Sequence, residues 1–271
     1  MSILPIRGDG ARALDLPLPP RPMPALRRGR PLKRWRYVAV YGPELTLCVG
    51  DARIAGVPQR WWAVALPDGR LFEGSSGVAL GAGRVQAGEG VIELSIAEHP
   101  AGDRRAVEVV SPHGRSFIWT RKQAGLPVSG TVRVGGEEHR VDGPLGFVDE
   151  SAGYHARRTT WRWSAGIGRA RDGRPLAWNL VDGVHDAATA SERTVWVDGE
   201  PHEVEPQEFA ADLSTVGALT FSEWCAREER RNLLVLRSDY RQPFGAFSGS
   251  LPGGLELESG YGVMEWHDVR W

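Results

Sequence analysis

The sequence has little lysine, little cysteine and almost no net charge, and each shortage excludes a class of protein. Lys33 and Lys122 are its two lysines, and 33 basic against 34 acidic side chains leave a formal net charge of −1. A chain without a basic excess lacks the electrostatic footprint that nucleic acids require, so no nucleic-acid partner is expected. Two cysteines, Cys48 and Cys225, are too few for the disulfide framework of a small secreted domain.

Long apolar runs are missing as well. The opening MSILPIRGDGARALDLPLPP lacks the charged start and the apolar stretch of a secretion signal. No stretch approaches the ~20 apolar residues needed to cross a bilayer. We therefore expect a cytoplasmic protein with no integral membrane segment.

Motifs for common nucleophiles, cofactors and metals are incomplete. The run Gly245–Gly249 lacks the central serine of a nucleophile elbow, and Gly81, Gly83 and Gly88 miss the dinucleotide-binding spacing. No paired-cysteine motif is present. Two His-Asp dipeptides are present, His185-Asp186 and His267-Asp268. Adjacent residues on a strand point to opposite faces, so neither dipeptide can bind one metal ion with both side chains. We expect neither a cofactor nor a metal.

Tight-turn signals are the main positive feature of the chain. Glycine reaches positive φ without steric cost, so Asp-Gly and Gly-Gly pairs between strand-like stretches predict β-hairpins. The six pairs are Asp68-Gly69, Gly135-Gly136, Asp142-Gly143, Asp172-Gly173, Asp198-Gly199 and Gly253-Gly254. The sequence predicts an all-β fold of two consecutive antiparallel barrels or barrel-like sandwiches. One short helix is expected from Phe221 to Arg231, because Phe221, Trp224 and Cys225 have helical spacing.

Three segments follow from composition. Residues 1–32 carry seven prolines and no apolar periodicity, so they are expected to be extended or disordered and to lie outside the core. A glycine-rich passage over 142–158 separates two strand-rich halves. We place the first barrel at residues 33–150 and the second at 151–271.

Tryptophan is frequent, with 11 residues against 7 phenylalanines and 5 tyrosines. Strand alternation puts Trp161 and Trp163 on one face of their strand, and Trp178 lies on the next strand. Large flat rings suit either a two-layer core or the wall of a cavity. Core packing is a sufficient role for most of these tryptophans. A role in ligand binding requires a hollow interior.

Polar residues beside these strands are candidates for a site. Asp149, Tyr154 and His155 precede the Trp161 strand at the predicted junction, a favoured place for pockets. Glu265 and His267 share one strand face. The catalytic candidates are His155, Asp149 and Glu265, and the ligand-binding candidates are Tyr154, Trp161, Trp163, Trp178, Asn179, Tyr240, Trp266 and His267. The alternatives are structural: His155 satisfied by a backbone carbonyl, and the Glu265/His267 pair on a solvated face.

Several stretches together resemble a bacterial family catalogued as domain of unknown function 2804. They are KRWRYVAVYGPEL, CVGDARI, AGYHARRTTWRWSAGIG, AWNLVDGVHD, RTVWVDGEPHEV, RSDYRQPFGAFSG and GYGVMEWHDVRW. The family has no assigned activity. The two-barrel arrangement is also similar to the lipocalin-like carotenoid hydratase and Diels-Alderase group, which implies lipocalin-like barrels and a hydrophobic, polyene-type substrate. That resemblance implies a protonation or templating reaction with Asp149, Glu265 or His155 beside the tryptophans.

Three functions remain open. The first is binding of a hydrophobic small molecule, such as a lipid or isoprenoid, in a Trp-lined barrel cavity. The second is a cofactor-independent lyase, hydratase or isomerase that uses a pocket acid. An enzyme needs a titratable group with a perturbed pKa inside the cavity, whereas a carrier needs only apolar walls. The third is an interaction module with solid barrels and an exposed apolar patch.

Overall fold

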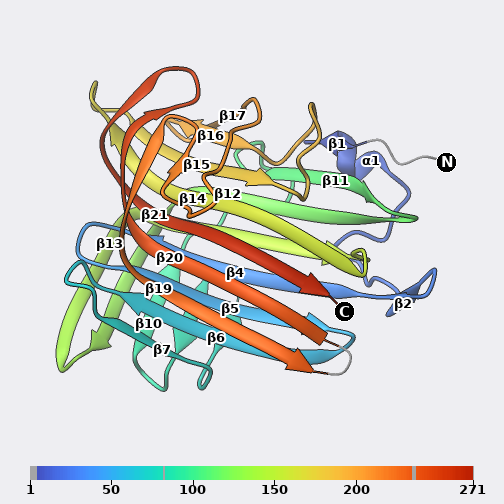
Figure 1. Ribbon diagram of the computed structural model, residues 1–271, viewed down its shortest axis with the longest axis horizontal. Helices are drawn as coiled ribbons and strands as arrows, with labels where there is room; N and C mark the ends of the chain where they lie inside the picture. Colours follow the sequence, from blue (N-terminus) through green and yellow to red (C-terminus); the bar gives the residue numbers. More distant parts are fainter. Residues whose placement is uncertain (1–4, 82, 234–235, 271) are drawn as a thin grey trace.

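The chain folds into two large antiparallel sheets that pack against each other (Figure 1). The structure is a computed structural model that describes residues 5–81, 83–233 and 236–270. Within those residues, α1 (Gly10–Ala13) is the one α-helix, and the other regular elements are strands. The all-β prediction is confirmed.

The first sheet contains 11 strands within the described chain, in the order β7-β6-β5-β4-β13-β12-β10-β9-β8, with β11 between β12 and β1. These strands are β1 (Ile6–Arg7), β4 (Lys33–Tyr41), β5 (Thr46–Ile54), β6 (Val57–Ala65), β7 (Leu71–Gly74), β8 (Ala79–Gly81), β9 (Arg84–Ala87), β10 (Ile92–Ile96), β11 (Val107–His113), β12 (Ser116–Val134) and β13 (Glu137–Gly153).

The second sheet contains eight strands within the same described ranges, in the order β17-β16-β15-β14-β21-β20-β19-β18. These are β14 (Arg158–Ala170), β15 (Pro175–Asp182), β16 (Thr194–Val197), β17 (Glu200–Glu203), β18 (Thr215–Val216), β19 (Leu219–Leu233), β20 (Leu236–Leu251) and β21 (Leu255–Arg270). The first sheet ends at Gly153 and the second begins at Arg158. Division of the chain into domains at 150/151 stays a prediction.

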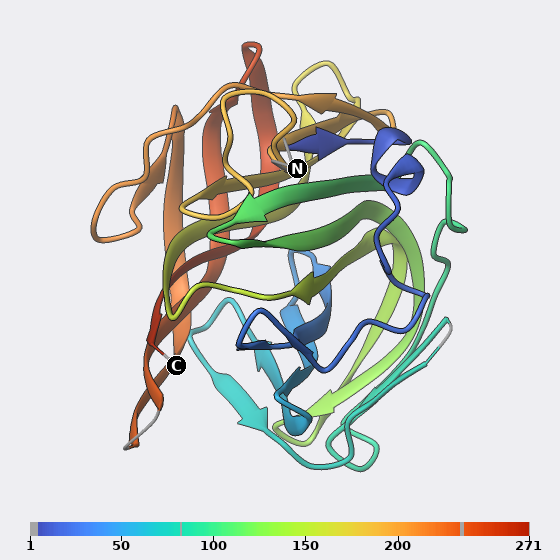
Figure 2. The ribbon, with the colours of Figure 1, turned by 90° about the vertical axis from the view of Figure 1, so that its right-hand side faces the viewer.

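Strand β12 makes the first sheet curl. Its first half pairs with β11 and its second half with β10, and register shifts between Ala124 and Val128 separate the halves. Irregular pairing of this kind bends a strand and increases its twist. The long β12–β13 hairpin therefore carries the sheet around its own core (Figure 2).

Five of the six turn signals join consecutive strands, and their glycines have positive φ, as at Gly69 (89°) and Gly173 (90°). The sixth prediction is wrong. Asp142 and Gly143 lie inside β13, where Gly143 (φ 126°) pairs with Val128 next to the irregular part of β12. There glycine accommodates a distorted ladder instead of a turn.

The predicted helix from Phe221 to Arg231 is wrong, because this stretch belongs to strand β19. The register shifts between Glu223 and Cys225, so one extra residue interrupts the alternation. As a result Phe221 and Cys225 pack on opposite faces of the sheet, in different apolar clusters. A bulge thus produced the spacing that looked helical.

The proline-rich beginning also departs from expectation. Residues 1–4 lie outside the described residues, but Ala11 and Leu18 are buried with Phe117 and Tyr154 against the first sheet. Excluding this segment from the core was therefore wrong. Two short strands, β2 (Leu26–Arg27) and β3 (Arg30–Pro31), form a separate hairpin before β4.

Three larger apolar clusters position the site. The first sheet buries one face around Val49, Trp62 and Ile92, and the second buries one face around Trp178 and Phe247. The third cluster lies between the sheets and includes residues from both. Among the described residues, the structure contains no helix long and apolar enough to cross a membrane.

Candidate functional site

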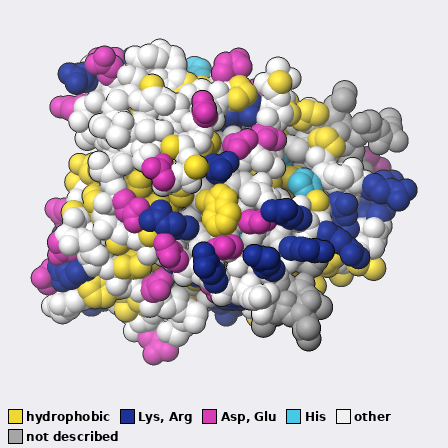
Figure 3. Space-filling view, in the orientation of Figure 1, with side chains coloured by type: hydrophobic (Ala, Val, Ile, Leu, Met, Phe, Trp, Pro, Cys, Tyr) yellow, Lys and Arg dark blue, Asp and Glu magenta, His cyan; other side chains and the backbone are white. Residues whose placement is uncertain are grey.

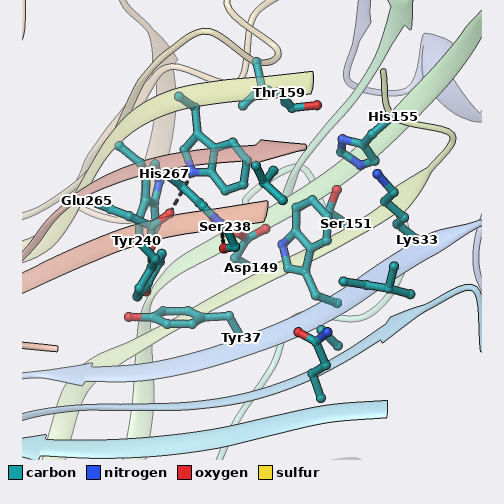
Figure 4. Close-up of a pocket in the computed structure, with 18 of the residues that line it drawn as sticks. Lys33, Tyr37, Asp149, Ser151, His155, Thr159, Ser238, Tyr240, Glu265 and His267 are labelled. Atoms are coloured by element: carbon teal, nitrogen blue, oxygen red, sulfur yellow. Dashed lines mark hydrogen bonds between the residues drawn. The ribbon is translucent and has the colours of Figure 1, made fainter. Parts of the chain in front are cut away.

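A pocket of about 190 Å³ lies between the two sheets (Figure 4). Its wall combines β4, β5, β6, β12 and β13 from the first sheet with β14, β15, β19, β20 and β21 from the second. The face of each sheet that points away from this pocket is filled by an apolar cluster, around Ile92 inside the curled first sheet and around Trp178 in the second. The expectation of a cavity inside a barrel is thus corrected, because the hollow is at the junction of the sheets.

Aromatic side chains form much of the pocket wall. They are Trp35, Tyr37, Trp61, Trp161, Trp163 and Tyr240. Strand alternation accounts for their direction, since each lies two positions from another inward side chain on its strand. Tyr37 meets Trp163 edge to face, with ring centroids 5.6 Å apart, so the two sheets are also joined by this contact.

Glu265 is the central polar group. Its side chain enters the wall from β21 and the residue is only 8% exposed. Trp161 Nε1 donates to Oε1 at 2.7 Å, while the Tyr240 hydroxyl and Gln242 Nε2 donate to Oε2 at 3.0 and 2.9 Å. Burial raises the pKa of Glu265 to about 7 despite these donors. The carboxyl group can therefore hold or release a proton near neutral pH.

His267 stands next to Glu265 on the same face of β21. Its Nε2 lies 2.8 Å from Ser238 Oγ, and its ring contacts Trp161 and Tyr240 at centroid distances of 4.4 and 5.1 Å. Burial lowers the pKa of His267 to about 3, so the imidazole is neutral at pH 7. It shapes the wall around Glu265 without adding charge.

A buried ion cluster occupies the deep side of the pocket. Lys122 Nζ lies 2.7 Å from Asp149 Oδ1 and 3.4 Å from Glu192 Oε1, and it also lies 5.7 Å from the Trp163 ring centroid. Burial raises the pKa of Glu192 to about 7, although Lys122 opposes the shift. One cation with two carboxyl groups is neutral overall when Glu192 is protonated, which suits an enclosed site.

Histidines form another part of the wall. His155 and His185 are each 6% exposed, and neither Nε2 atom has a hydrogen-bond partner among the described residues. His185 Nδ1 lies 2.8 Å from Ser111 Oγ. Burial, followed by the charge of Lys33, lowers the pKa of His155 well below its usual value. Figure 4 shows His155 and Lys33 on one side of the pocket, opposite Glu265 and Tyr240.

Seven of the sequence-predicted site residues line this pocket: Asp149, His155, Trp161, Trp163, Tyr240, Glu265 and His267. The other four do not. Trp178 and Trp266 point to the opposite face of the second sheet, and Tyr154 packs on Phe117 with its hydroxyl donating to the Pro24 carbonyl. Asn179 lies behind the wall, where its Oδ1 accepts from Trp163 Nε1.

Sequence reasoning missed several polar residues of the wall. Lys122 and Glu192 come from β12 and from the loop after β15, which no sequence spacing relates. The sequence marks only Lys122, and only weakly, as one of two lysines in a chain whose other basic side chains are arginines. Among the described residues, no group of three or more His, Cys, Asp or Glu side chains is arranged to hold a metal ion.

The chain belongs to the family described as domain of unknown function DUF2804, whose family model matches residues 73–271. The predicted family membership is confirmed. No curated protein matches the chain.

Several solved structures are distantly similar to this chain. A Nitrosomonas europaea protein assigned as AttH has 14% identity over 93% of this chain and 98% of the other, with a TM-score of 0.43. CghA has 13% identity, coverage of 98% and 97%, and a TM-score of 0.41. Kievitone hydratase from Nectria haematococca has 10% identity, coverage of 86% and 88%, and a TM-score of 0.37. Similarity this remote supports no conclusion about the reaction or the ligand of this chain.

Proposed function

We propose that the pocket binds a small, largely apolar molecule and that Glu265 exchanges a proton with it in a cofactor-independent reaction. The supporting observation is a carboxyl group in the wall of an aromatic pocket, held by three donors, with its pKa raised to about 7. General acid catalysis is most efficient when the pKa of the acid lies near the working pH. The reaction class is lyase, hydratase or isomerase.

The chemistry follows from the contacts of Glu265. The protonated carboxyl gives its proton to a carbon of a substrate double bond, whose π electrons form the new C–H bond. Trp161 and Tyr37 line the pocket, and aromatic rings favour a positive charge that develops over their faces. The carboxylate then removes a proton either from an attacking water or from the neighbouring carbon, which restores the acid and yields an alcohol or a shifted alkene.

Glu265 is a better acid than the other two candidates. Asp149 is held in an ion pair with Lys122 at 2.7 Å, so its carboxylate is already committed to a cation. His155 has a pKa well below its usual value and is neutral at pH 7, with no proton to donate as an imidazolium. Both lie in the same pocket, where we propose that they bind and orient.

Binding without chemistry is the second candidate function. The aromatic wall favours it, because flat rings bury apolar ligands with few polar requirements. A carrier of a lipid or isoprenoid would use the same rings but would have no need for a raised pKa at Glu265. The cytoplasmic location remains a prediction of the sequence.

Deuterium incorporation separates the two functions. A panel of small apolar alkenes is incubated with the protein in D₂O, and new C–D bonds are measured by mass spectrometry. We expect Glu265→Gln to incorporate deuterium at least ~100-fold more slowly than the unmodified protein, since general acids contribute about 10²–10⁴-fold. Glu258→Gln, an exposed position on the same strand, is the matched control and should be unaffected.

Two results would contradict the proposal. Equal deuterium incorporation by the Glu265→Gln variant would remove Glu265 from the chemistry. Binding of panel members with no incorporation above background would identify the protein as a carrier.

A further inference from the structure

The pocket has a second polar side that the proposed proton transfer does not use. His155 and His185 present buried Nε2 atoms without hydrogen-bond partners among the described residues. An unsatisfied buried polar atom costs about 1–3 kcal/mol, so native structures rarely leave one without a protein, water or ligand partner. Within the described chain, four atoms of this kind belong to the pocket wall, the other two being Trp61 Nε1 and His267 Nδ1. The pair on His155 and His185, whose rings interact electrostatically, points to a group that binds between them.

The charged groups around this side are cationic. Burial and the neighbouring Arg30 lower the pKa of Lys33 to about 7, so Lys33 is partly protonated at neutral pH and Arg30 is charged throughout. Lys33 and Arg30 both act electrostatically on His155, and Lys33, which is 2% exposed, lines the pocket beside it. His113 lies against His155, with ring centroids 5.5 Å apart. Within the described part of the chain, no carboxylate is among the groups that act most strongly on the pKa of His155, whereas Asp149 raises the pKa of Glu265. The His155 side therefore favours a negatively charged oxygen of a ligand and disfavours a positively charged ligand group.

The surface next to this side extends the positive field. Arg34 lies opposite Arg53 in the first sheet, and Arg270 lies opposite Arg237 in the second. On the other side of Arg270, Arg158 is paired with Asp268 at 2.9 Å and adds no net charge. Like charges directly opposite each other destabilise a sheet. Figure 3 shows dark-blue side chains gathered on the right-hand part of the visible face, near the end where β4 begins and β21 ends in Figure 1. Clustered positive charge raises the concentration of anions at this end of the molecule.

We propose that His155 and His185, with Lys33 beside them, bind the carboxylate of an apolar acid whose hydrocarbon body extends along the tryptophans towards Glu265. The substrate class is thus an unsaturated carboxylic acid with a small apolar body. This inference rests on the proposed function only in treating the acid as a substrate, because the binding subsite stands on the histidines. A bound water is the competing occupant of the two Nε2 atoms.

Matched probes test the subsite by binding alone. Octanoate and 1-octanol share their hydrocarbon and differ in charge at pH 7, and their affinities can be compared by calorimetry and tryptophan fluorescence. We expect octanoate to bind at least ~10-fold more tightly, a difference of about 1.4 kcal/mol. Equal affinity, tighter binding of octanol, or no binding of either probe would overturn the proposal.

Variants locate the carboxylate. His155→Phe keeps a ring against Trp35 and should reduce the preference for octanoate to below ~2-fold while leaving octanol affinity unchanged. His155→Gln keeps a donor and should retain part of the preference, which guards against a folding defect in the first variant. His202→Gln, on an exposed edge strand, is the control.

The Glu265→Gln variant separates this inference from the proposed function. It should keep the octanoate preference, because Glu265 lies on the opposite side of the pocket (Figure 4). If proton transfer does not depend on Glu265 but His155→Phe still abolishes the preference, the function fails and the subsite stands. A preference that survives His155→Phe would show that the carboxylate binds elsewhere.

Discussion

At the scale of single residues, one buried carboxyl group decides what the pocket can do. Glu265 accepts from Trp161, Tyr240 and Gln242, and these donors favour its ionised form. Burial outweighs them and leaves the pKa at about 7.

The first prediction concerns stability against pH. The pKa of Glu265 is about 7 when folded and near 4.5 when unfolded, so its stabilising effect is full below about pH 4.5 and is lost as pH rises through about 7. We expect the unmodified protein to lose about 3 kcal/mol relative to Glu265→Gln over that range. Urea unfolding from pH 4.5 to 8.5 measures the difference. Parallel curves of unfolding free energy against pH for the two proteins would contradict this prediction. Glu258→Gln is the control and should behave like the unmodified protein.

The second prediction concerns the ion cluster. Lys122→Met leaves Asp149 and Glu192 buried without their cation, and breaking a buried pair costs about 3–5 kcal/mol. The loss should be smaller at pH 5, where Glu192 is protonated in both proteins. Arg133→Met removes an arginine that is half exposed and should cost at most about 1 kcal/mol. Equal losses for the two variants in chemical unfolding would argue against a buried cluster.

At the scale of strands, tryptophans lie across glycines on neighbouring strands. Gly50 pairs with Trp61, Gly74 with Trp62, and Gly166 is opposite Trp178. A Cβ added at Gly50 or Gly166 would meet the facing ring at 2.2 Å. These glycines therefore let large rings lie flat on the sheet, both in the pocket wall and in the core.

The third prediction tests this arrangement. Gly166→Ala forces the fully buried Trp178 ring to move, and overpacking of this kind costs about 1–3 kcal/mol. Gly81→Ala is the control, since a Cβ there meets nothing within 4 Å and its φ is not positive. Thermal unfolding compares the two. An unchanged melting temperature for Gly166→Ala would mean that the ring can move without cost.

The strands were largely predictable and the contacts between them were not. Alternation along β21 placed Glu265 and His267 on one face, and the pocket lies on that face. The same alternation placed Trp266 on the other, where it packs in the core. The bulge in β19 could not be read from spacing, because an extra strand residue imitates a helical repeat. The pairing of Lys122 with Glu192 depends on how distant strands meet, which no local pattern encodes.

At the scale of the whole molecule, the beginning of the chain ties the two sheets together. Arg7 is the second residue of β1 in the first sheet, and its guanidinium donates to the Ser191 carbonyl at 2.5 Å and to Thr194 Oγ1 at 2.9 Å. Ser191 belongs to the loop that carries His185 and Glu192 into the pocket. The site therefore depends on a contact between residues 184 positions apart in sequence.

The fourth prediction concerns this link. Arg7→Ala should destabilise the protein by about 1–3 kcal/mol, because buried acceptors lose their donor. Amide hydrogen exchange should also quicken in the loop before β16. Arg104→Ala is a matched control, since Arg104 also bridges the halves through Glu200 but is 81% exposed. If exchange in the loop is unchanged in Arg7→Ala, the loop is held by its other contacts.

The proton on Glu265 can be followed in solution, and its titration is the decisive measurement for the proposed acid. Carbon NMR of protein labelled at glutamate carboxyls, compared with the Glu265→Gln variant, isolates the one missing signal. We predict that this signal titrates near pH 7, as burial in the pocket requires. Titration near pH 4.5 would show a solvated carboxylate and would contradict the role proposed for Glu265.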